Sequence, residues 1–381
     1  MKILFVSRST IFSLTGGDTN QMIFSAKYLK EYGVTVDFYS NEFKPNYDDY
    51  DLIHYYNITR PAIILDQHEK SRKKYVITSI FVDYSFYGKT STNLKMKWLT
   101  RLFGTDGIRG KANIYPMTPE VATALGRAVT YYFQKKNKCQ KHPLVIIGKD
   151  TRLSCYMLEQ AFASGVCSQG GRVIFTGPLP TPGVAFVTKS MRADAGVMIS
   201  ASHNSFDDNG IKIFDADGFK LPDEVELILE DLILNPSKMP TVVGGEIGRA
   251  KRLEGVEGRY IVHVKTALES NYDMSGMRVV VDCANGASYK VAPMVLSELG
   301  AEVFKLGVNP NGENINLNSG SLHPEVARDE VVKLRADLGI CLDGDADRVQ
   351  IIDASGESID GDRLIGIFAK LMLEKGDLKT F

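Results

Sequence analysis

Short apolar runs and amphipathic segments alternate along this chain. The apolar runs predict buried β-strands, and segments whose apolar residues recur every three or four positions predict α-helices. We expect strands at residues 2–6, 34–39, 51–54, 74–78, 144–148, 172–175, 196–199, 278–282, 303–307 and 338–342, and helices at 22–32, 154–165 and 364–374, with others beginning at 118, 258 and 287. This alternation predicts α/β domains, in which ligands bind where the strands end.

Residues 1–95 form a separate region that opens as strand, helix, strand. A loop with two glycines at its start is expected at residues 16–20. The later strands continue the alternation, so the region looks like most of a Rossmann-like half-domain. The first strand, the Gly-Gly loop and residues 51–56 resemble the N-terminal, acceptor-side part of two-domain retaining glycosyltransferases. Two alternatives stay open, because the glycines also fit a plain turn and His54 fits a histidine packed in a core.

A seam between two parts of the chain is expected at residues 84–98. Residues 88–93 are polar and rich in residues that break helices and strands, which is typical of a linker. Met96 would make a natural start for the part that follows. We therefore interpret the chain as a fusion or a misjoining of two reading frames.

A serine loop follows one of the buried strands. The apolar run opens into small polar residues, with Ser202 at the tip of the loop and His203 beside it. The turn-forming pair Asn209 and Gly210 follows, and then Lys212. A hydroxyl nucleophile, an imidazole and a cation in one small volume suit phosphoryl chemistry. The alternative is ordinary loop composition with a solvated lysine.

An acidic cluster follows another apolar strand. Asp343, Asp345 and Asp347 stand at alternate positions, so their carboxylates can turn to one side and ligate a hard divalent ion such as Mg²⁺. A calcium loop is excluded by spacing, because its sixth position would be Arg348 instead of Gly and its twelfth Ala354 instead of Glu. A dehalogenase nucleophile pair fits poorly, since Asp347 stands where Thr or Val would be expected. A solvated acidic turn remains as the alternative.

Together these stretches resemble the alpha-D-phosphohexomutases, and among them the bacterial phosphoglucosamine mutases. The matching stretches occur in the family's order, at residues 102–110, 147–152 and 177–183, in the Ser202 loop, at residues 281–287 and in the acidic cluster. The resemblance covers about residues 96–381. Ser205 stands where the family usually has Pro, and Ala346 replaces a frequent Gly, so these two positions affect loop geometry more than chemistry.

The resemblance implies interconversion of glucosamine 6-phosphate and glucosamine 1-phosphate. A phosphorylated Ser202 would give its group to the sugar phosphate, and the other phosphate of the reoriented bisphosphate would return to the serine. One Mg²⁺ per chain is implied, held by Asp343, Asp345, Asp347 and the phosphate on Ser202. A hexose 1,6-bisphosphate is implied as activator.

Three further roles are implied for four residues around the serine. Arg109 and Lys212 would steady the oxygens of the transferring phosphoryl group. Arg348 would bind the substrate from the other domain. His203 would be catalytic as a proton shuttle, although a supporting role fits a residue beside the nucleophile equally well.

The resemblance also implies a domain plan. Residues 99–255 would form a first phosphohexomutase domain with the phosphoserine loop, residues 256–355 a second with the metal loop, and residues 356–381 the start of a third. We expect the rest of the third domain and a fourth to be absent. On that expectation this chain would phosphorylate itself slowly but would not interconvert the sugar phosphates.

Composition supports a globular protein without a nucleic-acid or membrane partner. The 381 residues carry 45 Lys and Arg against 46 Asp and Glu, so no charged surface for such a partner is expected. The five cysteines show neither a disulfide framework nor zinc-site spacing, and we expect them to be reduced. No stretch approaches the ~20 apolar residues of a membrane span. A cytoplasmic protein with a phosphosugar substrate is expected, and a homo-oligomer is compatible with this.

Three classes of function remain open from the sequence. The chain is a working phosphohexomutase, a fragment that keeps only the phosphoserine and metal half-site, or a glycosyltransferase-like binding module with an inert remainder. The choice of glucosamine rests on the match of residues 103–107 and of the Ser202 stretch.

Overall fold

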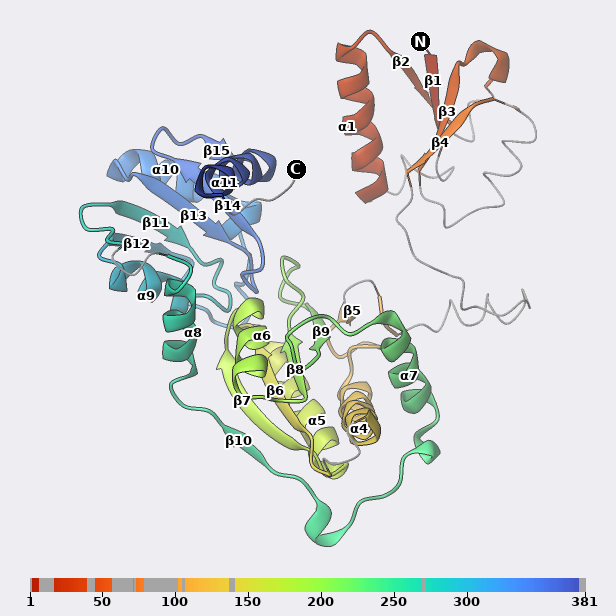
Figure 1. Ribbon diagram of the computed structural model, residues 1–381, viewed down its shortest axis with the longest axis vertical. Coiled ribbons are helices and arrows are strands. Elements are labelled where there is room, and N and C mark those ends of the chain that lie inside the picture. The colour runs from red at the N-terminus through yellow and green to blue at the C-terminus, as the bar shows by residue number, and fades with distance from the viewer. Residues whose placement is uncertain are drawn as a thin grey trace. The chain divides into compact units, whose positions relative to one another are not determined.

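The computed structural model describes most of the chain as two compact units, Met1–Met96 and Lys97–Phe381 (Figure 1). The described residues are 2–6, 17–39, 45–56, 71, 73–78, 102–104, 107–136, 141–268 and 272–376. The predicted seam at residues 84–98 lies outside the described residues, so it stays a prediction.

The first unit holds a four-stranded parallel sheet in the order β2-β1-β3-β4. Its elements are β1 (Lys2–Val6), α1 (Gly17–Glu31), β2 (Thr35–Phe38), the 3₁₀ turn η1 (Tyr47–Asp49), β3 (Leu52–Tyr56) and β4 (Tyr75–Thr78). Met22 and Ala26 of α1 pack with Phe5 of β1, which builds the βαβ core. The predicted strand–helix–strand opening is confirmed, whereas the glycosyltransferase resemblance of this region stays a prediction.

Two features of the first unit bear on the sequence predictions. The loop predicted at residues 16–20 is wrong for residues 17–20, which form the first turn of α1. A helix that packs an apolar face on a sheet can begin with weak helix formers, so local composition did not locate its start. The ring of His54 packs edge to face on Phe5, with the ring centroids 5.1 Å apart, as expected of a core histidine.

The second unit begins with a six-stranded sheet in the order β10-β7-β6-β8-β9-β5. Its strands are β5 (Ile108–Lys111), β6 (Leu144–Lys149), β7 (Arg172–Pro178), β8 (Ala195–Ile199), β9 (Asp208–Phe214) and β10 (Ala250–Arg252). Its helices are α4 (Pro119–Lys136), α5 (Leu153–Ser168), α6 (Thr181–Ser190) and α7 (Asp223–Leu234), with 3₁₀ turns η2 (Pro236–Lys238) and η3 (Gly244–Glu246). Helices α4, α5 and α7 share one core with the sheet, and α6 shares the other, so the sheet lies between two helical layers (Figure 1).

Helix α4 begins where the sequence predicted it. The N–H of Val121 donates to Thr118 Oγ1 (3.4 Å), so Thr118 caps the helix and Pro119 occupies its first position. Leu125 and Val129 are fully buried one turn apart.

A five-stranded sheet in the order β12-β11-β13-β14-β15 completes the second unit. Its strands are β11 (Arg278–Asp282), β12 (Glu302–Leu306), β13 (Leu338–Leu342), β14 (Val349–Asp353) and β15 (Ser358–Ile359). The accompanying helices are α8 (Val256–Lys265), α9 (Val291–Glu298), α10 (Glu325–Leu334) and α11 (Gly361–Lys375), with the 3₁₀ turn η4 (Gly320–Leu322). Strands β11, β12 and β13 are parallel, and β14 and β15 run antiparallel to their neighbours. The α/β fold class is therefore confirmed in both sheets.

The serine loop joins two adjacent antiparallel strands, β8 and β9. In their register Met198 lies opposite Lys212. Asn209 and Gly210 lie inside β9, so the predicted turn at this pair is wrong. The strand pairs with β8 on one side and β5 on the other, and a Cβ at Gly210 would lie 2.6 Å from Ser200 O. The glycine thus serves a close approach of two backbones instead of a turn.

The described cysteines agree with a reduced protein. Cys155, Cys167, Cys283 and Cys341 are free thiols. Across the ranges that the structure describes, no helix combines the length and the apolar composition needed to cross a bilayer.

Candidate active site

Ser202 lies three residues after the last residue of β8, in a strained and almost fully buried turn. Its backbone φ of +54° is left-handed, which costs a residue with a Cβ roughly 1–2 kcal/mol. The N–H of Ser202 donates to Ser200 Oγ (2.9 Å), and Ser202 Oγ donates to Asp343 Oδ2 (2.6 Å). A hydroxyl that follows β8 of the six-stranded sheet thus contacts a carboxylate that follows β13 of the five-stranded sheet.

The acidic cluster follows β13 and gathers three carboxylates as predicted. Oxygen atoms of Asp343, Asp345 and Asp347 all lie within 4.8 Å of one another, with the first two residues fully buried. The ammonium of Lys212 lies 3.1 Å from an oxygen of Asp345 and 3.1 Å from one of Asp347. Lys212 itself is only 6% exposed, which excludes the alternative of a solvated lysine.

The pKa values of the two buried carboxylates are shifted in opposite directions. Burial, with the nearby charge of Asp345, raises the pKa of Asp343 to about 6. Burial would also raise the pKa of Asp345, but the charge of Lys212 and the hydroxyl of Thr181 outweigh it and hold that pKa below its usual value. Thr181 Oγ1 donates to Asp345 Oδ2 (2.7 Å) from the start of α6. Two neighbouring carboxylates therefore differ because only one has a cation in contact.

The oxygen atoms of the acidic cluster fit a bound divalent cation. Asp345 Oδ1 is buried without a hydrogen-bond partner, and the carboxylates of Asp343 and Asp347 lie beside it. Unpartnered buried oxygens are costly, and carboxylate oxygens are the ligands that Mg²⁺ prefers in proteins. These residues therefore fit a bound Mg²⁺, with the ammonium of Lys212 close by.

His203 lies beside the serine hydroxyl. Its Nδ1 is 3.4 Å from Ser202 Oγ, and its side chain is half-buried. Burial, together with the positive charges of Arg348 and Arg109, lowers the pKa of His203. A lowered pKa keeps the imidazole neutral at pH 7, so it can accept a proton.

Both predicted arginines lie around the same serine loop. The backbone N–H of Arg348 donates to Asp343 Oδ1 (3.2 Å), and its exposed guanidinium lies 3.9 Å from Asp347 Oδ1. Arg109 is half-buried in β5, which pairs with β9, and its charge acts on His203. The structure therefore brings every residue of the predicted site to one place.

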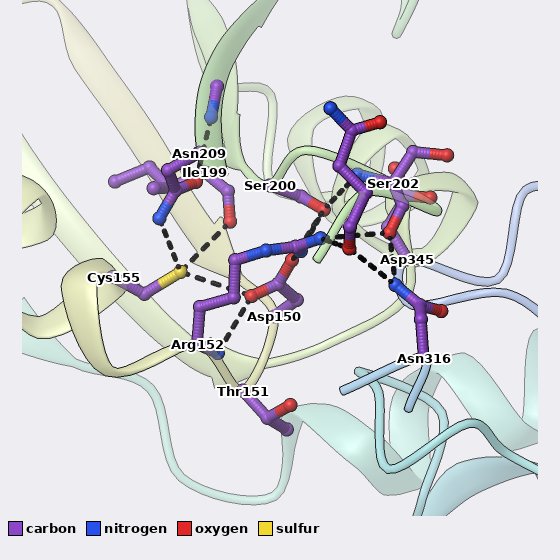
Figure 2. Close-up of polar contacts among 12 residues, drawn as sticks. Asp150, Thr151, Arg152, Cys155, Ile199, Ser200, Ser202, Asn209, Asn316 and Asp345 are labelled. Atoms are coloured by element: carbon purple, nitrogen blue, oxygen red, sulfur yellow. Dashed lines mark hydrogen bonds and ion pairs between the residues drawn. The ribbon is translucent and has the colours of Figure 1, made fainter. Parts of the chain in front are cut away.

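Several residues that support this site were not predicted from the sequence. Figure 2 shows Arg152 between Asp150 and the serine loop, with Asn316 approaching the same loop from the segment before η4. Thr181, which binds Asp345, was missed as well. Asp150 and Arg152 follow β6, and Thr181 follows β7, so their positions at strand ends were the available signal.

The sequence of the second unit matches one family in two consecutive parts. Residues 100–239 match the family described as "Phosphoglucomutase/phosphomannomutase, alpha/beta/alpha domain I", and residues 258–356 match the corresponding "alpha/beta/alpha domain II". The phosphoglucosamine mutase of Geobacter sp. (strain M21) is 57% identical over 284 residues, which are 74% of this chain and 62% of that protein. The phosphoglucosamine mutase of Pelobacter propionicus is also 57% identical, with the same coverage. The chain thus spans less than two thirds of the length of these relatives.

Solved structures agree with the sequence matches. A phosphoglucomutase/phosphomannomutase family protein from Burkholderia thailandensis superposes with a TM-score of 0.62 at 26% identity, over 72% of this chain and 59% of that one. A phosphomannomutase-like structure from Thermus thermophilus has a TM-score of 0.61 at 23% identity, over 72% and 62%, and supports the fold alone. With both domains matched in order and the relatives more than half identical, the chain belongs to the phosphoglucomutase/phosphomannomutase family, the alpha-D-phosphohexomutases.

Proposed function

We propose that this chain transfers a phosphoryl group through Ser202 and that its substrates are glucosamine 6-phosphate and glucosamine 1-phosphate. The observation that carries the proposal is the contact of Ser202 Oγ with Asp343 inside a three-carboxylate cluster. The glucosamine substrate is supported by relatives at 57% identity that are phosphoglucosamine mutases.

The side chains have separate roles in this proposal. Ser202 Oγ carries the phosphate and passes it to a sugar hydroxyl, so the bond from phosphorus to the serine oxygen breaks as the bond to the sugar oxygen forms. The neutral imidazole of His203 accepts the proton that the attacking hydroxyl releases and passes it to the departing Ser202 Oγ, which lies 3.4 Å from its Nδ1. Lys212 and Arg109 place positive charge near the phosphoryl oxygens, where negative charge gathers in the transition state. Arg348, which is exposed beside the cluster, is free to reach the substrate.

Asp343, Asp345 and Asp347 would hold Mg²⁺ in this reaction. When bound there, the ion supplies positive charge that neutralises the transferring group. The phosphate on Ser202 would complete the ligand set from the facing loop.

Phosphate labelling tests the role of Ser202. The protein, incubated with Mg²⁺ and glucose 1,6-bisphosphate or glucosamine 1,6-bisphosphate, should gain one phosphate on the peptide that contains Ser202. Mass spectrometry should show no gain in Ser202→Ala, and an unchanged gain in the control Ser205→Ala, since Ser205 is an exposed serine of the same loop. A phosphate found on Ser200 or Ser205 in the wild type would identify a different nucleophile.

Calorimetric titration with Mg²⁺ tests the metal site. Asp345→Asn removes one of three formal charges from the cluster and should weaken Mg²⁺ binding at least about tenfold. The matched control is Asp217→Asn, which removes a charge from an exposed turn outside the cluster and should bind as the wild type does. Equal affinity in Asp345→Asn and the wild type would show that Mg²⁺ binds elsewhere.

A further inference from the structure

Two backbone carbonyl groups of the serine loop are each held from two sides. Ser202 O accepts from Arg152 Nη2 (3.1 Å) and from Asn316 Nδ2 (2.9 Å). Asn204 O accepts from the same two nitrogens, at 2.6 Å and 3.0 Å. Figure 2 shows the two side chains reaching the loop from different parts of the chain, since Arg152 follows β6 and Asn316 lies in the loop that precedes η4. Four hydrogen bonds therefore meet at the two carbonyl groups that flank His203.

Arg152 is fixed before it reaches the loop. It is fully buried and forms an ion pair with Asp150, which also accepts from the Arg152 backbone N–H (2.9 Å) and from Ser200 Oγ (2.5 Å). A buried charge is tolerated when its partner and its hydrogen bonds are all in place. The fixed guanidinium then donates from its Nη2 to both Ser202 O and Asn204 O.

Asn316 is equally constrained. It is 8% exposed, and its φ of +58° is a left-handed conformation that asparagine adopts more readily than most residues. Its backbone N–H donates to Ala284 O (2.9 Å). Both groups near its amide are carbonyl oxygens, so only the amide nitrogen can face them.

We propose that Arg152 and Asn316 are positioning residues that hold Ser202 in its left-handed turn and so aim Ser202 Oγ at Asp343. Neither residue touches the serine hydroxyl, so each acts through the backbone of the loop. Asn316 lies on the same side of the site as the acidic cluster. It therefore couples the position of Ser202 to the position of that cluster. The inference rests on the proposed function of Ser202, and its test separates the two.

The test compares two glycine variants. Asn316 and Asn318 both have positive φ, +58° and +49°, so glycine fits either backbone without strain, but Asn318 is exposed. Asn316→Gly should lower the limiting rate of Ser202 phosphorylation by glucose 1,6-bisphosphate at least about tenfold and leave the half-saturating concentration within about twofold, since the nucleophile is misaligned while the substrate contacts remain. Asn318→Gly should change neither value. Rates are measured at a temperature at which circular dichroism shows all proteins fully folded.

Hydrogen exchange gives a readout that does not depend on activity. In Asn316→Gly the amides of residues 200–206 should exchange about tenfold faster than in Asn318→Gly, because two of the four hydrogen bonds that hold the loop are gone. Arg152→Lys keeps a positive charge beside Asp150 but lacks the planar fork, so it should show both changes. If the wild type is labelled on Ser202 and Asn316→Gly keeps its limiting rate and exchange, the inference is refuted. If the wild type is not labelled, the proposed function fails, and the exchange comparison alone decides whether these residues hold the loop.

Discussion

Replacing Gly344 by alanine should push apart the two loops that meet at Ser202. Gly344 lies between two carboxylates of the cluster, and a Cβ there would lie 2.6 Å from Ser202 O, 2.8 Å from Ile315 Cδ1 and 2.9 Å from Asn316 Nδ2. Its φ is not left-handed, so alanine adds no backbone strain and the effect is one of space alone. The nearest contact is a backbone oxygen, which cannot rotate away.

The magnitude follows from these distances. To reach an ordinary contact of 3.4 Å, the new methyl group and Ser202 O must separate by about 0.8 Å. Overpacking of a buried site typically costs about 1–3 kcal/mol of the free energy of unfolding. A displacement of about 1 Å at a reacting group reduces rates by roughly a hundredfold. We therefore expect Ser202 phosphorylation in Gly344→Ala to be about ten- to a hundredfold slower than in the wild type.

Urea unfolding and the labelling assay measure the two effects separately. The matched control is Gly258→Ala in α8, where a Cβ would meet nothing within 4 Å. Alanine in place of glycine in the first turn of α8 should stabilise this variant by up to about 1 kcal/mol and leave labelling unchanged. Wild-type stability together with a wild-type labelling rate in Gly344→Ala would refute the close contact of the two loops.

Three further predictions concern the charged cluster and its loop. Lys212→Met should destabilise the metal-free protein by about 3 kcal/mol or more, because Asp345 and Asp347 lose their cation. Saturating Mg²⁺ should recover part of this stability in urea titrations, and no recovery would contradict the metal site. The pKa of Asp343 is raised in the folded protein, so the contribution of this group to stability is complete below about pH 3.8 and is lost as the pH rises through about 6. Without metal, the unfolding midpoint of Asp343→Asn should match that of the wild type near pH 4 and exceed it above pH 6. A difference in midpoint that stays constant with pH would contradict this. Ala346→Gly should raise the free energy of unfolding by up to about 1 kcal/mol in calorimetry, because Ala346 has a φ of +55°, which glycine adopts without strain. A loss of stability would show instead that packing of the alanine methyl group outweighs this strain.

Sequence patterns predicted the parts of the site that depend on neighbouring residues. The ends of β8 and β13 were predictable because an apolar run followed by small polar residues marks where a buried strand ends. These two strand ends carry Ser202 and Asp343, which are 141 residues apart and meet at 2.6 Å. Their meeting came from the family resemblance, since no local pattern pairs two strand ends in different sheets.

Contacts that depend on tertiary structure were not predictable. Asn316 lies 114 residues from Ser202, and its loop composition fits turn formation as well as a contact. The Asn209–Gly210 turn was predicted from local propensity, but pairing of β9 on both sides satisfies the backbone there and overrides it. The partner of Asn316, and β5 among the two partners of β9, lie far along the chain.

The hairpin of β8 and β9 limits where this sequence can change in length during evolution. Adjacent residues of a strand face opposite sides, so one residue inserted into or deleted from β9 ahead of Lys212 would turn its ammonium into the core that Ile211 and Ile213 occupy. An insertion within residues 205–207, after the two carbonyl groups that Arg152 and Asn316 hold, leaves both that alternation and the turn at Ser202 intact. Gaps in an alignment of related proteins should therefore fall in this short segment, and a gap inside the strand would mark a relative whose lysine no longer reaches the cluster.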